Sequence, residues 1–535
     1  MAPPPAPAPF PPLVGGRLVV ATIALSLATF MNVLDTTIAN VALTSIAGDL
    51  GVSPSQGTWV ITSFGVANAI AVPLTGWLSQ RLGVLRLFIA SVLLFTLASL
   101  LCALAGSLEV LLVCRALQGM VAGPMIPLSQ ALLLQSYPKA KAGTAIAMWS
   151  MTTTVAPVMG PVLGGWLTDN LSWPWIFYIN VPFGLISAWL TWLALRGRDT
   201  PARKLSVDYV GLILLVIWVG ATQIMLDKGK ELDWFNSSQI VCLSIVAVVA
   251  FTFFLIWELT EARPIVDLTL FRGRNFTAGT IAITLGYAVF FGNIVLIPMW
   301  LQRFMGYTAT WAGLVTAPVG FFALMLSPLV GRLMDRIDPR VFATVSFLVF
   351  AACGFWRSGF SADVDPGTIA LTHLLQGIAL ATFFIPLTAI ILSGLEPQRV
   401  PAASGLYNFM RIMAGSFAAS VWTTLWEDGA ARHHAYLTES VTAGTAAVGD
   451  TLSTIQGLGT TTLQASAMLD QEVTRQAYIL SAIDLFQLTG GLFVALIVLI
   501  WLAKPRRSAR TGTATPPPAA RVDAAGRPQP ASPPS

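Results

Sequence analysis

Residues 18–41 read LVVATIALSLATFMNVLDTTIANV, and Asp35 is their only charged residue. A helix of about 20 apolar residues spans the roughly 30 Å hydrocarbon core of a bilayer. This run is too long for the apolar core of a secretory signal, and it has no evident small-residue cleavage site. We therefore predict a retained transmembrane helix that carries one acid.

Apolar runs of similar length recur along the chain, which is 55% hydrophobic and only 10% charged. Soluble domains carry about 25% charged residues, so this composition favours lipid as the outer solvent. We predict an all-α integral membrane protein with fourteen spans: 18–42, 57–78, 84–105, 108–134, 142–167, 174–195, 208–227, 237–258, 277–301, 311–334, 340–359, 367–393, 401–425 and 478–502.

The lysines and arginines predict the orientation of these spans. About 22 of the 30 fall in loops on one side and about six in loops on the other. Loops rich in Lys and Arg remain in the cytoplasm, so an even number of helices places both termini there. Because the positive charges lie in many short loops rather than in one basic stripe, we expect no nucleic-acid partner.

An internal repeat predicts two halves. Residues 115–119 read RALQG and residues 373–377 read HLLQG, while GWLSQR at 76–81 is echoed by GRLMDR at 331–336. Offsets of 258 and 255 residues indicate a pair of six-helix halves with two helices inserted between them. The predicted units are a disordered tail 1–17, halves 18–195 and 277–502, linker helices 207–258, an outer polar segment 427–477 and a disordered tail 506–535.

We single out five ionisable side chains inside the predicted spans: Asp35, Arg115, His373, Arg411 and Asp484. Such groups are costly in a bilayer unless they are paired or hydrated, so each is a functional candidate. Helical rise places Asp35 about 24 Å from the inner end of its helix and Arg115 about 10 Å below the outer face. Both then lie in the outer half of the membrane, with His373 and Asp484 at a similar level and Arg411 nearer the midplane.

We interpret Asp35 and Arg115 as a proton-coupling pair. Removal from water favours the neutral form of a carboxyl group, whereas a nearby cation favours its charged form. A pocket that opens alternately to each side can exchange these influences. The alternative is a static pair that fixes helix packing. His373 is either a core histidine or part of a pathway, and the same two roles are open for Arg411 and Asp484.

Small residues and prolines form a second pattern, which predicts close packing and gating. Residues spaced four apart let helix backbones approach, and proline bends a helix; the set is Pro157, Gly160, Pro161, Gly164 and Gly165. The turn after the second span adds Gly76, Arg81 and Gly83, with Asp335 in the matching turn of the second half. Ordinary membrane packing and cytoplasmic anchoring are the simpler interpretations.

Other chemistries lack their motifs. We expect no bound cofactor and no metal, because His433 and His434 have no ligand cluster around them. No GxxxxGK[ST] loop occurs, so ATP is not the expected energy source. The four cysteines fall inside apolar runs, and we predict that they are small core residues: Cys102, Cys114, Cys242 and Cys353. Nothing in the sequence predicts an enzyme.

Five motifs in order resemble the fourteen-helix drug:proton antiporter branch of the major facilitator superfamily, and permeases of the EmrB type within it. They lie at 34–42, 76–86, 115–119, 157–165 and 173–184. The resemblance implies pathway roles for Asn40 and Gln118. The sequence departs from the superfamily pattern at Gln80, where many members have an acid, whereas Asp335 keeps one.

The resemblance implies a proton-driven multidrug efflux permease in the bacterial inner membrane. Its partners would be membrane lipids, a periplasmic adaptor similar to EmrA, docked on 427–477, and an outer-membrane channel similar to TolC. Two acids and two arginines balance within the spans, which favours neutral or weakly acidic hydrophobic substrates over dications. Export of one lipid or metabolite, and a membrane enzyme or receptor, are the alternatives.

Overall fold

The computed structural model describes residues 10–52, 54–138, 141–202, 208–229, 231–261, 264–334, 336–441 and 446–503. Every regular element within these ranges is a helix, which confirms the predicted all-α class. The predicted tail 506–535 and Asp335 lie outside the described residues. Ahead of the first helix, Leu13 is buried and its N–H donates a hydrogen bond to the carbonyl oxygen of Ser136 (2.8 Å).

The first half of the fold consists of helices between residues 16 and 195. They are α1 (Gly16–Val41), α2 (Leu43–Asp49), α3 (Pro54–Gly57), α4 (Trp59–Ala71), α5 (Thr75–Leu82), α6 (Val84–Ala103), α7 (Leu108–Ala122), α8 (Met125–Ser136), α9 (Ala142–Asn170), α10 (Trp175–Tyr178) and α11 (Asn180–Leu195). Helix α1 packs against α8, α9 and α11, and α4 packs against α7.

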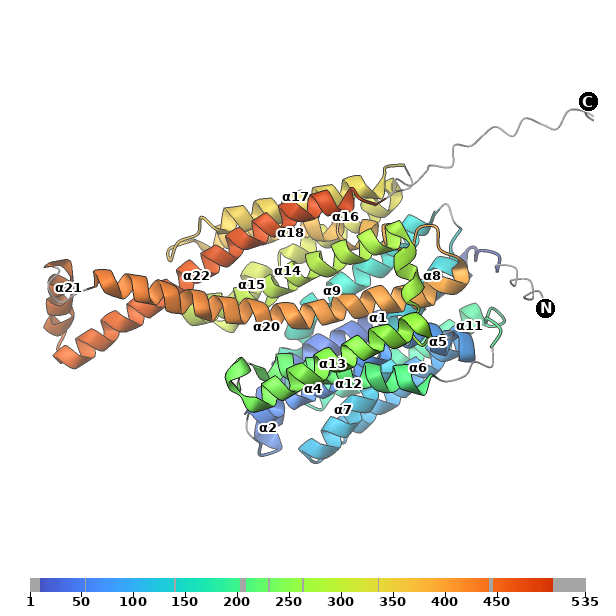
Figure 1. The fold of residues 1–535 in the computed structure, drawn as a ribbon, viewed down its shortest axis with the longest axis horizontal. Helices are drawn as coiled ribbons and strands as arrows, with labels where there is room; N and C mark the ends of the chain where they lie inside the picture. Colours follow the sequence, from blue (N-terminus) through green and yellow to red (C-terminus); the bar gives the residue numbers. More distant parts are fainter. Residues whose placement is uncertain are drawn as a thin grey trace, which may run out of the picture.

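The second half lies between residues 274 and 500. Its helices are α14 (Arg274–Phe304), α15 (Ala309–Thr316), α16 (Val319–Leu333), α17 (Pro339–Arg357), α18 (Pro366–Ala381), α19 (Phe384–Ile391), α20 (Val400–Ser440), α21 (Ala446–Gly457) and α22 (Thr462–Ile500). Between the halves in sequence, α12 (Tyr209–Gly229) and α13 (Ser238–Thr260) pack against each other, and α12 also contacts α4 and α20 (Figure 1).

Several predicted spans are pairs of helices broken near a proline. Pro73 separates α4 from α5, which meet at a bend of 63°, and Pro318 separates α15 from α16. Proline lacks the N–H that continues a helix and clashes with the preceding turn. Within the described ranges, eleven helical segments are long and apolar enough to cross a membrane, and the bent pair makes twelve if it is a single span. The count of fourteen is consistent with this, since α9 and α20 occupy the two remaining predicted spans.

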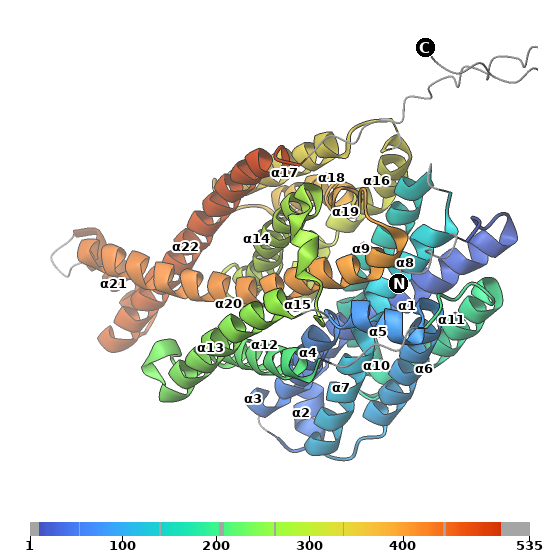
Figure 2. The same ribbon diagram turned by 45° about the vertical axis from the view of Figure 1, so that its right-hand side comes forward.

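Helices α20 and α22 are longer than their predicted spans. They contain 41 and 39 residues, so the described part of the predicted polar segment 427–477 is mostly helical. In Figures 1 and 2 their far ends, together with α21, project beyond the rest of the bundle. We call this feature, residues 427–441 and 446–477, the projecting hairpin.

Apolar side chains cover much of the outside of the bundle. In α13, Val248, Phe253 and Ile256 are more than half exposed, as expected for a helix whose solvent is lipid. Three cysteines are buried, but Cys242 on α13 is exposed. The prediction of a core position was therefore wrong for Cys242, because a helix that is apolar all round does not show which face meets the protein.

Candidate functional site

Asp35 of α1 and Arg115 of α7 form an ion pair in the core of the first half. Arg115 Nη1 donates to Asp35 Oδ2 at 2.6 Å, and the two side chains are 0% and 1% exposed. Arg115 Nε also donates to the carbonyl oxygen of Val60, which fixes the guanidinium against α4. The two residues that the sequence placed at one membrane level are thus in contact.

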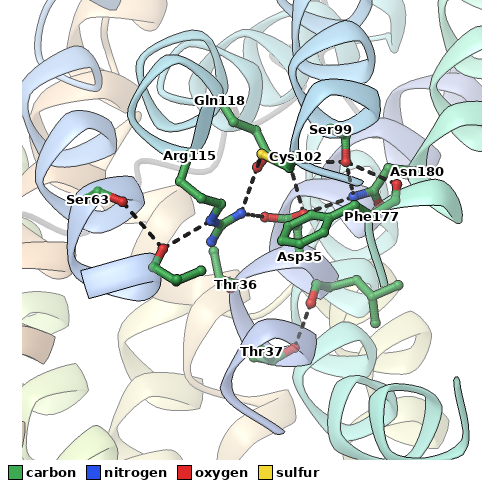
Figure 3. A network of polar contacts seen from close by, with 12 residues as sticks. Asp35, Thr36, Thr37, Ser63, Ser99, Cys102, Arg115, Gln118, Phe177 and Asn180 are labelled. Carbon is green, nitrogen blue, oxygen red and sulfur yellow. Dashed lines mark hydrogen bonds and ion pairs between the residues drawn. The ribbon is translucent and has the colours of Figure 1, made fainter. Parts of the chain in front are cut away.

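Two amides complete the coordination of the carboxylate (Figure 3). Gln118 Nε2 and Asn180 Nδ2 both donate to Asp35 Oδ1, at 3.0 and 2.8 Å. Gln118 Oε1 in turn accepts from Arg115 Nη1 at 2.7 Å, and both amides donate to Ser99 Oγ. Residues from α1, α6, α7 and α11 therefore meet in one buried network.

Aromatic rings separate this network from water. The Arg115 guanidinium lies 4.3 Å from the ring centre of Phe64 and 5.5 Å from that of Phe177. A buried ion pair persists only when its remaining donors and acceptors are satisfied, because neither charge is solvated. Here each oxygen of Asp35 accepts at least one hydrogen bond. Removal of either charge would leave the other charge buried without its counter-ion.

The small-residue seam lies on the helix turns that follow Asp35. A Cβ atom at Gly160 of α9 would come within 2.1 Å of Thr37 Oγ1, and one at Gly164 within 2.8 Å of Ile38. Only glycine at these positions permits the observed approach of α9 to α1. Helix α9 also contains Pro157, Pro161 and Gly165, but the side chains of the two prolines, and that of Asn40, are outside the part of the chain that the structure describes.

The turn between α5 and α6 needs glycine for two reasons. Gly83 has φ +91°, a conformation that side chains disfavour, and a Cβ there would meet Asp199 at 2.7 Å. The Asp199 carboxylate accepts from the Leu85 N–H at 3.0 Å and pairs with Arg86 at 3.2 Å. Predicted Arg81 lies over the ring of Trp77, 5.1 Å from its centre.

The two halves touch at the end of the bundle that contains this turn. A Cβ at Gly76 of α5 would lie 2.6 Å from the Cβ of Ala402 on α20, and one at Gly331 of α16 would lie 2.5 Å from the Cβ of Ala147 on α9. Gln130 of α8 accepts hydrogen bonds from Ser404 and Tyr407 of α20, each at 2.7 Å. This end is tightly packed and closed.

The predicted residues of the second half do not form a copy of the Asp35 pair. His373 is buried and its Nδ1 lies 2.9 Å from the carbonyl oxygen of Ile369. Arg411 packs over Tyr287 and Phe384, at 4.9 and 5.8 Å from the ring centres, and contacts Asn408. Neither side chain contacts an acid among the described residues.

Asp484 lies apart from these residues, near the base of the projecting hairpin. Its side chain is 62% exposed, and its Oδ2 is 2.7 Å from His433 Nε2 of α20. His434 makes a similar contact with Asp470 at 3.2 Å. The two histidines of the predicted outer segment therefore join α20 to α22, and no cluster of metal-ligating side chains occurs among the described residues.

Several buried polar residues were missed by sequence reasoning, among them Asn180, Ser99, Arg357 and Glu258. Asn180 and Ser99 are neutral, so a search for charged side chains passed over them, although Asn180 belongs to one of the quoted motifs. Arg357 falls inside the predicted span 340–359 and should have been counted. It is 4% exposed, and Glu258 in the predicted span 237–258 is 3% exposed, so the predicted count of two acids and two arginines within the spans was incomplete.

A model of the Major Facilitator Superfamily matches residues 25–419. The chain belongs to the major facilitator superfamily. It is 53% identical over 495 residues to the multidrug export protein EmrB of Escherichia coli strain K12, covering 92% of this chain and 97% of that protein. It is 49% identical over 496 residues to the fatty acid resistance protein FarB of Neisseria gonorrhoeae, covering 93% and 98%.

Solved structures of the superfamily share the fold. The human organic anion transporter MFSD10 superimposes with a TM-score of 0.58 over 91% of this chain and 100% of its own, at 13% identity. The predictions of a major facilitator fold and of a transporter rather than an enzyme are therefore confirmed. The Asp35–Arg115 network then lies in the first half of a membrane transporter.

Proposed function

We propose that this protein is a proton-driven multidrug efflux permease. The observation that carries the proposal is the buried Asp35–Arg115–Gln118–Asn180 network, in which the Asp35 carboxylate accepts three hydrogen bonds. The similarity to EmrB of Escherichia coli supports multidrug export. Coupling to protons rests on the chemistry of the network.

The coupling step exchanges a cation for a proton at Asp35. In the described state the Arg115 guanidinium neutralises the carboxylate at 2.6 Å. Separation of α7 from α1 would leave the buried Asp35 carboxylate without its counter-charge. A proton that enters from the open side of the membrane then binds Asp35 in place of Arg115, because burial favours the neutral carboxyl group. Return of Arg115 displaces that proton, and the released proton leaves on the side that is then open.

The packed contacts between the halves act as the gate. Gly76 against Ala402 and Gly331 against Ala147 close one end of the bundle, and the distribution of positive loops assigns that end to the cytoplasm. Opening it requires the α5–α20 and α9–α16 contacts to separate. The α1–α9 seam at Gly160 and Gly164 joins this movement to the helix that carries Asp35.

The proposed assembly is a tripartite pump of a bacterial inner membrane. Both termini lie in the cytoplasm, and the projecting hairpin extends into the periplasm, where an EmrA-like adaptor binds it and a TolC-like channel continues the path outward. The unit boundaries proposed from sequence, 18–195, 207–258 and 277–502, describe the two halves and the inserted pair. A single-metabolite or lipid exporter is the second candidate, favoured by the similarity to FarB.

Transport by the purified protein in proteoliposomes tests the proposal. An imposed pH gradient should drive several chemically unrelated hydrophobic compounds across the membrane, and an uncoupler should stop this transport. Transport of one compound class alone supports the second candidate. Transport that persists after the gradient is collapsed would refute proton coupling.

A further inference from the structure

Two carboxyl groups face each other where the inserted helices α12 and α13 meet. Asp208 comes directly before α12, and Glu258 lies in the last turn of α13. A Cβ atom at Gly211 would clash with Asp208 Oδ2 and would lie 2.7 Å from Glu258 Oε1, so these two oxygens point into the same space. Glycine at position 211 leaves that space open.

Neither of these two oxygens has a hydrogen-bond partner, although both are buried. The Glu258 residue is only 3% exposed. The second oxygen of each acid is occupied: Asp208 Oδ1 accepts from Trp257 Nε1 and from the Gly211 N–H, each at 2.9 Å. Glu258 Oε2 accepts from the Val266 N–H at 3.1 Å. A buried, unsatisfied oxygen on each of two facing acids calls for a ligand between them.

The charges around this pair do not compensate it. Neither Asp208 nor Glu258 takes part in an ion pair among the described residues. Glu261, which follows α13, interacts electrostatically with Glu258 and adds negative charge. Asp267 lies nearby in the chain, but Arg399 already pairs with it at 2.6 Å. Two ionised carboxylates that face each other away from water repel strongly, and this repulsion is relieved when one of them binds a proton.

A proton fits the space between these oxygens better than a metal ion. A hydrogen bond between two carboxyl groups needs one O–H donor and one acceptor oxygen, and the pair supplies both. Mg²⁺ and Ca²⁺ take about six to eight oxygen ligands. In the part of the chain that the structure describes, no group of three or more His, Cys, Asp or Glu side chains could hold a metal ion.

We propose that Asp208 and Glu258 share one proton, which fastens the inserted helices to the start of the second half. The proton lies on Glu258 Oε1 and is donated to Asp208 Oδ2, so that both oxygens are satisfied. The Val266 N–H joins Glu258 to the segment before α14. The Asp267–Arg399 ion pair joins the same segment to the start of α20. Loss of the proton therefore weakens a connection that leads to the closed end of the bundle.

Infrared spectroscopy of the full-length protein in detergent detects the shared proton. A protonated carboxyl group has a carbonyl stretching band that ionised carboxylates lack, and the band shifts when H2O is replaced by D2O. At a pH of about 6, above the ordinary carboxyl range of about 4, the wild-type protein should show this band. Glu258→Gln should diminish it, because the amide NH2 then donates to Asp208 Oδ2, whereas Glu396→Gln, at an exposed acid, should not. A band that is absent from the wild-type protein, or unchanged in Glu258→Gln, overturns the proposal.

The pH dependence of thermal unfolding is the second measurement. The folded protein holds a proton that carboxyl groups of the unfolded chain release above a pH of about 4 to 5. Because the folded state then binds more protons, this stabilisation is full at low pH and is lost as the pH rises, by up to about tenfold in the unfolding equilibrium per pH unit. Glu258→Gln should remove this part of the pH response, and Glu396→Gln should keep it.

Two further results keep the test decisive. If Glu258→Gln does not fold, Asp208→Asn takes its place, because its amide also replaces the shared proton with a fixed N–H donor. A melting temperature that rises with added calcium in the wild-type protein but not in the variant would identify a metal cation and overturn the proposal. Both readouts are independent of transport, so a wild-type protein that exports nothing would refute the proposed function and leave the shared proton standing.

Discussion

At the scale of single residues, the Asp35 carboxylate has three different donors. Arg115 supplies a charge, while Gln118 and Asn180 supply neutral N–H groups. The amides remain bonded to Ser99 as well, so they can keep their geometry when Arg115 moves. With one charged donor and two neutral donors, Asp35 can exchange Arg115 for a proton while Gln118 and Asn180 keep the shape of the site.

Asp35→Asn should abolish transport driven by the pH gradient. The amide keeps the shape of the side chain, but it does not ionise and so cannot take up and release the transported proton. Because Arg115 then lacks a buried counter-ion, the variant should also lose about 3 kcal/mol of stability. Proteoliposome transport and the melting temperature measure the two effects.

Asp35→Asn combined with Arg115→Gln is the matched control for stability. With both charges removed, most of the lost stability should return, since no charge is left unpaired. Transport should remain uncoupled from the gradient. Full proton-coupled export by Asp35→Asn alone would remove Asp35 from the mechanism and leave the pair as a packing device.

At the scale of helices, small residues let helices of the two halves approach closely at one end of the bundle. Gly76→Ala should weaken the closed contact between α5 and α20, because the new Cβ would lie 2.6 Å from the Cβ of Ala402. Overpacking of this kind costs about 1–3 kcal/mol, enough to shift a conformational equilibrium by about fivefold to a hundredfold. Transport rates should fall accordingly.

Two further substitutions test whether this effect is local. Ala402→Gly in the Gly76→Ala background should restore only part of the rate, because it removes the Ala402 methyl group but leaves the Ala402 Cα at 2.8 Å from the new Cβ. Gly65→Ala on α4 should have little effect, since open space surrounds a Cβ at that position. A similar loss of rate in both glycine variants would point to helix propensity rather than to the contact.

The projecting hairpin should carry the contact with the adaptor. Tyr436 of α20 and Leu463 of α22 are 71% and 82% exposed, so each offers apolar area for a partner to bury. Tyr436→Glu with Leu463→Glu should prevent co-purification of the adaptor while transport in proteoliposomes continues. Glu439→Gln, a polar change on the same helix, is the control; unchanged adaptor binding in the double variant would reject the docking surface.

The sequence predicted elements better than it predicted their contacts. Apolar runs located the helices, because each had to be long enough for a bilayer. Single charges located Asp35 and Arg115, since a lone charge in an apolar run is conspicuous. Asn180 and Ser99 were not singled out, because a neutral polar residue in a helix gives no sign of the partner it meets from another helix.

Local patterns also failed where tertiary packing decides exposure or length. Asp484 was predicted at the membrane level of His373, and the sequence did not show that its side chain would be 62% exposed and would pair with His433 of α20. The polar segment after residue 426 gave no hint of a helix, yet α20 continues to Ser440. Contacts such as those of His433 and His434 with α22 support that extension, and they join residues 36 and 51 positions apart.

At the scale of the whole molecule, the proposed orientation places the two ends of the bundle in different compartments. Single cysteines at Tyr436 and Arg86, in a protein whose exposed Cys242 is replaced by serine, should therefore react differently with a membrane-impermeant maleimide. Tyr436 is 71% exposed on the projecting hairpin, and the Arg86 side chain is 78% exposed beside the closed end. In spheroplasts, Tyr436→Cys should be labelled at once and Arg86→Cys only after permeabilisation.

The buried Cys102, Cys114 and Cys353 should stay unlabelled and supply the background. Labelling of Arg86→Cys alone in sealed spheroplasts would reverse the orientation, and with it both the direction of export and the side from which Asp35 receives its proton.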